Sequence, residues 1–178
     1  LRALLAAPDI DVVCAVTQPA RPRGRHGTPE PTAVGALARE AGIPVLEPER
    51  LRRDTTEALT ALAPSAGVLA ASGHLLPEHL LAMFPHGVLN VHASLLPRHR
   101  GASPVAASIL AGDAETGASI MLIVRELDAG PVLSQVRTRI EPLDTTGTLT
   151  ERIAQLGAEE MVRVLPAWVG GDLEAVAQ

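Results

Sequence analysis

The chain has 178 residues, a length that corresponds to one domain, and its hydrophobic fraction of 47% is sufficient for a core. Its net charge of −5 argues against general adhesion to nucleic acid, although a local basic loop can still bind phosphates. The single cysteine, Cys14, excludes an internal disulfide and suits a reducing cytoplasm, and no apolar run approaches the roughly 20 residues that span a bilayer.

The first half of the chain alternates short apolar runs with segments of helical periodicity. Thr32 is the expected N-cap of one helix, and Gly42 is its expected stop. Pro77 is the expected first-turn proline of a shorter helix. We expect the end of a helix at 1–7, strands at 11–17, 44–46 and 66–71, helices at 32–41, 54–62 and 77–83, and a proline- and arginine-rich loop at 18–31.

The second half changes pattern after its first helix. We expect a strand at 87–91, a helix at 104–111, an antiparallel hairpin of 118–124 and 132–140 with its turn at 127–131, and a helix at 146–165 that Pro166 ends. The alternation of strands and helices predicts an α/β fold with a mostly parallel sheet and helices on both faces. The hairpin is expected to be an antiparallel addition to that sheet.

The strand at 87–91 leads into the most informative stretch of the chain. Asn90 is the only asparagine, and it lies two positions before His92, so both side chains point to the same face where the strand ends. Open α/β folds place their chemistry at the ends of parallel strands. An amide donor beside an imidazole suits a reaction that develops an oxyanion and moves a proton. The alternative interpretation is a buried, hydrogen-bonded polar pair.

Two further groups allow both a structural and a functional interpretation. Asp128, in a Leu-Asp-Ala-Gly turn, is either a turn former or a carboxylate that orients His92. The basic loop of Arg21, Arg23 and Arg25 is either solvated or captures an anionic or nucleic-acid substrate. No dinucleotide or phosphate-binding glycine motif is present, and the histidines and the cysteine do not form a metal-ligand pattern, so no metal is expected.

These residues make the chain resemble the formyltetrahydrofolate-dependent formyltransferases. The shared motifs are Asn-x-His at 90–92, Ser-Leu-Leu-Pro at 94–97 and Leu-Asp-x-Gly at 127–130. The arginine-rich loop and the Arg-Gly-Ala-Ser-Pro segment at 100–104 point to the branch that acts on initiator methionyl-tRNA. The resemblance implies a Rossmann-like formyltransferase fold and transfer of a formyl group from 10-formyltetrahydrofolate to the amino group of methionyl-initiator-tRNA, in translation initiation.

The resemblance also implies roles for individual residues. Asn90, His92 and Asp128 correspond to the catalytic residues of the family, and Arg21, Arg23 and Arg25 would meet the tRNA, with Arg25 the best single candidate. The implied protein is a cytoplasmic monomer without a metal. The folate donor would lie against Ala71, Ser72, Gly73, His74, Leu75, Ser94, Leu95, Leu96, Pro97 and Leu127.

The sequence differs from the pattern of the family at both of its ends. Residues 1–178 are expected to form the catalytic domain without the family's first strand, and without its C-terminal β-barrel of about 100 residues. Because a central strand would be missing, we expect poor or absent activity from residues 1–178 alone. Two alternatives stay open: a formyltransferase acting on glycinamide ribonucleotide or a nucleotide amino-sugar, and a catalytically inactive fragment that binds folate.

Overall fold

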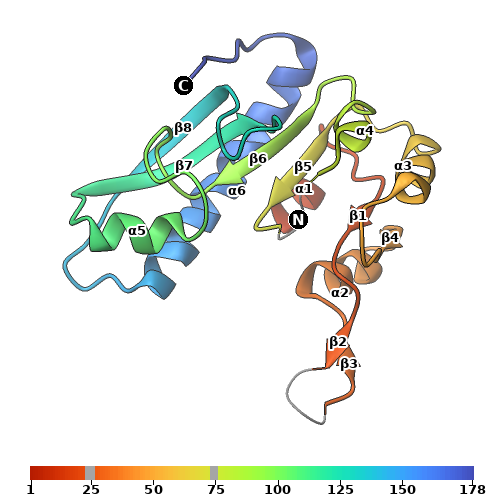
Figure 1. Ribbon diagram of the computed structural model, residues 1–178, viewed down its shortest axis with the longest axis horizontal. Helices are drawn as coiled ribbons and strands as arrows, with labels where there is room; N and C mark the ends of the chain where they lie inside the picture. The colour runs from red at the N-terminus through yellow and green to blue at the C-terminus, as the bar shows by residue number, and fades with distance from the viewer. Residues whose placement is uncertain (23–26, 73–75) are drawn as a thin grey trace. The chain divides into compact units, whose positions relative to one another are not determined.

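The computed structural model describes residues 1–22, 27–72 and 76–178 (Figure 1). The chain divides into two compact units. The first unit contains Leu1–Pro64 and the described part of 74–83, and the second contains Ser65–Gly73 and Phe84–Gln178.

The first unit consists of short elements. Its described elements are α1 (Arg2–Ala6), β1 (Ala15–Val16), β2 (Arg21–Pro22), β3 (Pro29–Glu30), α2 (Ala33–Glu40), β4 (Val45–Leu46), α3 (Arg53–Thr60) and α4 (Glu78–Leu81). β1 pairs with β4 in parallel, and β2 pairs with β3 antiparallel. The predicted cap of α2 is confirmed, since Thr32 Oγ1 accepts a hydrogen bond of 3.0 Å from the Gly35 N–H.

Two predicted features of the first unit, the length of its first strand and the position of Pro77, differ from the structure. The strand expected at 11–17 forms only over Ala15–Val16, because its partner β4 is only two residues long and lies between Pro44 and Pro48, which have no N–H to extend a ladder. Pro77 is the N-cap of α4 rather than a residue of its first turn.

The second unit contains a four-stranded sheet with two helices (Figure 1). Its elements are β5 (Gly67–Ala70), β6 (Val88–His92), α5 (Pro104–Leu110), β7 (Glu115–Leu122), β8 (Val132–Arg139) and α6 (Thr146–Gly170). The strand order is β5-β6-β7-β8. β5 and β6 are parallel, whereas the β6–β7 and β7–β8 pairs are antiparallel. The predicted α/β class and the β7–β8 hairpin are confirmed, and within this unit the parallel pairing is confined to β5–β6.

Helix α6 packs against strands β6, β7 and β8 and against α5. The core beneath it contains Val105, Ala118, Leu149 and Ile153, all buried. Helix and sheet approach each other closely at Gly157, where an added Cβ would lie 2.5 Å from Val91 Cγ1 and 3.2 Å from Ala118 Cβ. The helix can therefore lie this close to the sheet because Gly157 has no side chain.

Replacing Gly157 with alanine is therefore expected to destabilise the fold by about 1–3 kcal/mol, since the helix or Val91 must move to admit the methyl group. Gly147→Ala in the same helix is the matched control, because its nearest contact is an ordinary 3.6 Å to Thr145 Oγ1. That control should be neutral or stabilise by up to about 1 kcal/mol. Thermal and urea unfolding measure both, and equal effects of the two substitutions would contradict the packing argument.

The last helix continues beyond its predicted end. Its start after the Thr145 cap is as expected, but Pro166 lies inside α6, and the prediction that this residue ends the helix was wrong. The final turn is fixed from outside, since the Trp168 indole Nε1–H donates to the His86 carbonyl at 2.8 Å. The helix ends instead at Gly171, whose φ of +83° suits the left-handed cap. No helix in the described part of the chain is long and apolar enough to cross a membrane.

Candidate active site

Strand β6 presents the two central residues. Asn90 and His92 lie two positions apart, opposite Met121 and Ser119 of β7, and are only 9% and 6% exposed. Among the described residues, none hydrogen-bonds to the Asn90 side chain. Its carboxamide therefore has unused hydrogen-bonding capacity, which a bound ligand can satisfy.

The His92 ring is held from two sides. Its Nε2 lies 2.9 Å from the His99 carbonyl oxygen, and its Nδ1 lies 3.6 Å from Asp128 Oδ2. Because a carbonyl can only accept, Nε2 carries the hydrogen and donates it. Nδ1 is therefore the ring nitrogen that is not committed to the His99 carbonyl, and it faces a carboxylate.

The Asp128 carboxylate is fixed by the loop that follows the Ser-Leu-Leu-Pro segment. Its Oδ2 accepts a hydrogen bond of 2.8 Å from the Gly101 N–H. The Asp128 backbone has a φ of +47°, a left-handed conformation that is uncommon for residues other than glycine and that is enriched in Asp and Asn. The turn thus presents the carboxylate to both His92 and Gly101, across 36 and 27 residues of sequence respectively.

The loop after His92 is held by a buried hydrogen-bond network centred on Ser119. The Ser119 hydroxyl donates to the Ser94 carbonyl at 2.6 Å and accepts from the Leu96 N–H at 3.1 Å and the Gln135 amide at 3.0 Å. Gln135 also donates to the Leu96 carbonyl at 2.8 Å, and the Ser94 hydroxyl donates to the Arg98 carbonyl at 2.6 Å. This network fixes the segment whose next residue, His99, accepts from His92.

His99 is itself held by an ion pair. Its ring Nε2 lies 2.7 Å from Asp113 Oδ2, and Arg98 Nη2 lies 2.5 Å from Asp113 Oδ1. The hydrogen bond from His99, together with the charge and hydrogen bond of Arg98, lowers the pKa of the Asp113 carboxyl against the opposing effect of burial. The His99 backbone has a φ of +54°, an uncommon left-handed conformation for a residue other than glycine.

We expect Asp113→Asn to lower the melting temperature by a few degrees at neutral pH. A depressed folded-state pKa stabilises the fold above the unfolded carboxyl pKa of about 3.9, and the stabilisation is lost as the pH falls through the lower folded value. The difference between wild type and variant should therefore shrink below about pH 4. Thermal unfolding from pH 7 to 2.5 measures it, with the exposed Asp9→Asn as control; a difference that persists unchanged at low pH would contradict the argument.

The residues that were predicted to bind the folate donor differ in their exposure to solvent. Ser94 and Leu96 are buried, and Leu95 is partly buried. Ala71, Ser72, Pro97 and Leu127 are exposed, Leu127 by 67%. Because Ser94 is buried, its hydroxyl hydrogen-bonds to the Arg98 carbonyl of the loop. Gly73, His74 and Leu75 lie outside the described residues.

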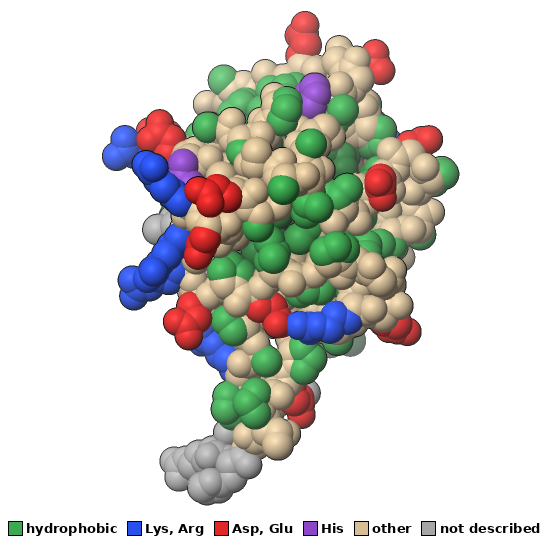
Figure 2. All heavy atoms as spheres, turned by 90° about the vertical axis from the view of Figure 1, so that its right-hand side faces the viewer, with side chains coloured by type: hydrophobic (Ala, Val, Ile, Leu, Met, Phe, Trp, Pro, Cys, Tyr) green, Lys and Arg blue, Asp and Glu red, His purple; other side chains and the backbone are tan. Residues whose placement is uncertain are grey.

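The basic loop is described only in part. Arg21 is exposed, and its Nη2 lies 3.3 Å from Gln18 Oε1. Arg23 and Arg25 lie outside the described residues. The face shown in Figure 2 carries side chains of both charge signs, with hydrophobic side chains exposed between them.

Two cavities border the loop after His92, with volumes of about 410 and 230 Å³. Neither is lined by Asn90, His92 or Asp128. The larger lies between Leu96, Pro97, the start of β8 and Gln178, and the smaller between the same loop, Asp113 and Arg137. Within the described ranges, no group of three or more His, Cys, Asp or Glu side chains could hold a metal ion.

Sequence reasoning missed the residues that hold the site together. They are His99, Gly101, Asp113, Ser119, Gln135 and Gln178. His99 and Gly101 lie within the motif region, but nothing local distinguishes Ser119, Gln135 or Gln178. Each acts through contacts with residues distant in sequence.

Comparisons with known proteins identify the family of this chain. The chain is 48% identical, over its whole length, to the methionyl-tRNA formyltransferase of Frankia alni, and 45% identical over 94% of its length to that of Myxococcus xanthus. In both comparisons it covers 54% of the relative, so the chain spans about half the length of the curated relatives it matches.

Solved structures share the fold. The phosphoribosylglycinamide formyltransferase of Coxiella burnetii aligns over 96% of this chain and 81% of its own, with a TM-score of 0.76 and 26% identity. That of Anaplasma phagocytophilum aligns over 95% and 80%, with a TM-score of 0.81 and 24% identity. The family model described as formyl transferase matches residues 4–165. This match, which covers most of the chain, shows that the chain belongs to the formyl transferase family.

Proposed function

We propose that this chain carries the catalytic site that transfers a formyl group from 10-formyltetrahydrofolate to the amino group of methionyl-initiator-tRNA. The observation that carries the chemistry is the buried His92 ring, whose Nε2 is committed to the His99 carbonyl and whose Nδ1 faces Asp128. The acceptor is supported by relatives named methionyl-tRNA formyltransferase at 45–48% identity.

Asn90 and His92 supply the hydrogen bonds that the reaction needs. When the amino nitrogen of the acceptor attacks the formyl carbon, the formyl oxygen becomes an oxyanion, to which the Asn90 amide and the protonated Nδ1–H of His92 donate. Nδ1 and Asp128 Oδ2 are 3.6 Å apart, which is longer than a full hydrogen bond and leaves the Nδ1–H available to the oxyanion. His92 Nε2 cannot serve, because it donates to His99.

Asp128 completes the proton transfer. The new C–N bond leaves a proton on the attacking nitrogen, and the bond between the formyl carbon and the folate nitrogen then breaks. Asp128 accepts the proton from the amine and passes it to the folate nitrogen that leaves, so the products are the formylated amine and tetrahydrofolate. The Gly101 N–H and the positive field of protonated His92 keep this carboxylate in place between transfers.

The two substrates are assigned to different segments. The donor's pterin can be read by backbone groups at 71–75 and beside Leu127, with the 94–97 loop forming part of its wall. The tRNA acceptor end would meet Arg21, Arg23 and Arg25. An acceptor of another kind, glycinamide ribonucleotide, is favoured only by the solved structures of similar fold, whose identity is 24–26%.

A formyl-transfer assay tests the proposal. The chain and a version carrying whatever its gene encodes on either side are each given 10-formyltetrahydrofolate with methionyl-initiator-tRNA or with glycinamide ribonucleotide. Arg25→Ala should weaken transfer to tRNA and leave transfer to the nucleotide unchanged. Transfer to glycinamide ribonucleotide alone would reject the tRNA acceptor. Folate binding without transfer to either acceptor would identify an inactive folate-binding protein.

A further inference from the structure

The segment after α6 returns to the strand that follows the Asp128 turn (Figure 1). Val176 and Val132 form an antiparallel bridge with N–O distances of 2.8 and 2.9 Å. This bridge adds the end of the described chain to the edge of β8 and places Gln178 beside the turn.

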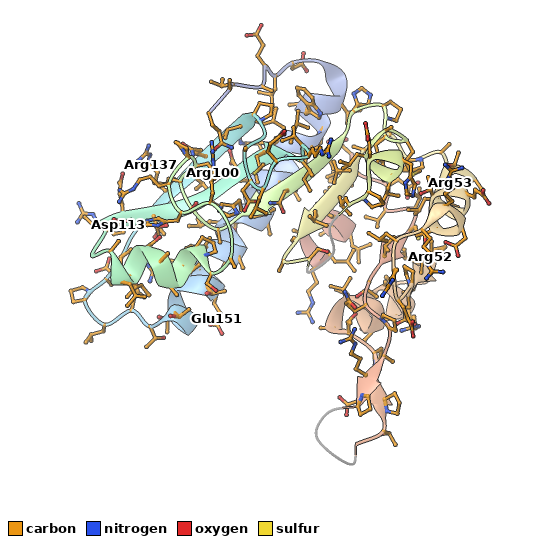
Figure 3. The ribbon with its side chains drawn as sticks, in the orientation of Figure 1. Arg52, Arg53, Arg100, Asp113, Arg137 and Glu151 are labelled. Carbon is orange, nitrogen blue, oxygen red and sulfur yellow. The ribbon has the colours of Figure 1, made fainter. Side chains whose placement is uncertain are left out.

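The Gln178 side chain uses both ends of its amide there. Its Nε2 donates to the backbone carbonyls of Asp128 at 3.0 Å and Gly130 at 2.6 Å. Its Oε1 accepts from Arg100 Nε at 3.0 Å and Nη2 at 2.8 Å. Figure 3 labels Arg100 in this part of the second unit. One side chain thus contacts three residues in two segments, the turn and Arg100, which lie 48 to 78 positions from it in sequence.

The turn needs such a support. Asp128 has a left-handed backbone, and its neighbour Leu127 is 67% exposed and so contributes little packing. Arg100 directly precedes Gly101, whose N–H donates to the Asp128 carboxylate. Gln178 therefore acts on Asp128 by two routes. It bonds directly to the Asp128 backbone carbonyl, and it bonds to Arg100, which precedes the glycine that binds the Asp128 carboxylate.

We propose that Gln178 is a positioning residue that fixes the Asp128 carboxylate against His92, an inference that rests on the proposed formyl transfer. Gln178→Glu separates the two routes. Glutamate keeps an oxygen for Arg100 but places a second oxygen against the two turn carbonyls, where only a donor fits. Gln178→Ala removes both routes.

The first readout does not depend on activity. In the full-length gene product, hydrogen exchange of the Gly101 amide reports its bond to Asp128, and Asp128→Ala gives the rate without that bond. We expect Gln178→Ala and Gln178→Glu to move the exchange rate toward that of Asp128→Ala. Gln155→Glu is the control, because within the described ranges the side chain of this exposed glutamine bonds only to Glu159 of α6. Wild-type exchange in both Gln178 variants would overturn the proposal.

The second readout is kinetic. Both variants should lower kcat about 10- to 100-fold with a melting temperature and folate KM close to those of wild type, since a small displacement of a catalytic group costs rate rather than binding. A fall in melting temperature without a fall in kcat would overturn the positioning role. If the wild type transfers no formyl group, the proposed function fails, and the Gly101 exchange still decides whether Gln178 positions Asp128.

Discussion

Replacing His92 with alanine is expected to lower kcat/KM for formyl transfer by about 10²–10⁴-fold. The ring lies on the same strand as Asn90, and its Nδ1 is 3.6 Å from Asp128 Oδ2. Its loss removes a hydrogen bond to the developing oxyanion and leaves the His99 carbonyl without its donor. Binding of tetrahydrofolate should remain, because the imidazole is not part of the proposed pterin contacts.

Steady-state formyl transfer and tetrahydrofolate binding measure this effect together. The matched control is His79→Ala, which removes an exposed histidine of α4 and should leave both measurements unchanged. Because His92 is buried, unfolding of each variant is followed in parallel, so that lost activity is compared only among folded proteins. A His92→Ala variant that folds, binds folate and retains more than about a tenth of the wild-type rate would contradict the assigned role.

Asp128→Asn is expected to lower kcat by about 10²–10⁴-fold while preserving the fold. Asparagine accepts the left-handed backbone at φ +47° as readily as aspartate does, and its side-chain oxygen can still accept from the Gly101 N–H. What changes is the charge: a neutral amide neither favours the imidazolium of His92 nor carries the proton from the amine to the folate nitrogen.

The substitution therefore separates geometry from charge. Stability and Gly101 hydrogen exchange should stay close to wild type, whereas kcat falls. Asp128→Ala is the companion variant, in which both the charge and the bond to Gly101 are lost. If Asp128→Asn were fully active, the carboxylate would be a turn former alone, which is the structural alternative that the sequence left open.

The local sequence was sufficient for much of the fold. Thr32 identified the start of one helix, because a side-chain oxygen that caps a helix acts within three residues. The hairpin of β7 and β8 followed from two strand-like runs around a Gly-Pro turn. The prediction that Pro166 ends the last helix failed because it used local sequence alone. The last turn of that helix is held by the bond from Trp168 to His86, which lies 82 residues away.

In the candidate site, too, local sequence determined some features and tertiary contacts determined others. The sequence by itself determined that Asn90 and His92 share one face of a strand, since side chains two positions apart on a strand always do. It also identified the family through motifs, and the family match over residues 4–165 agrees.

Only the tertiary structure decided which groups meet. It placed His92 Nδ1 3.6 Å from Asp128, gave Nε2 to the His99 carbonyl, and brought Gln178 to the Asp128 turn. These contacts join residues up to 78 positions apart, counting that between Gln178 and Arg100. These contacts depend on the register of the sheet and on the path of the chain after α6. Neither the register nor that path can be read from the periodicity or the motifs around the contacting residues.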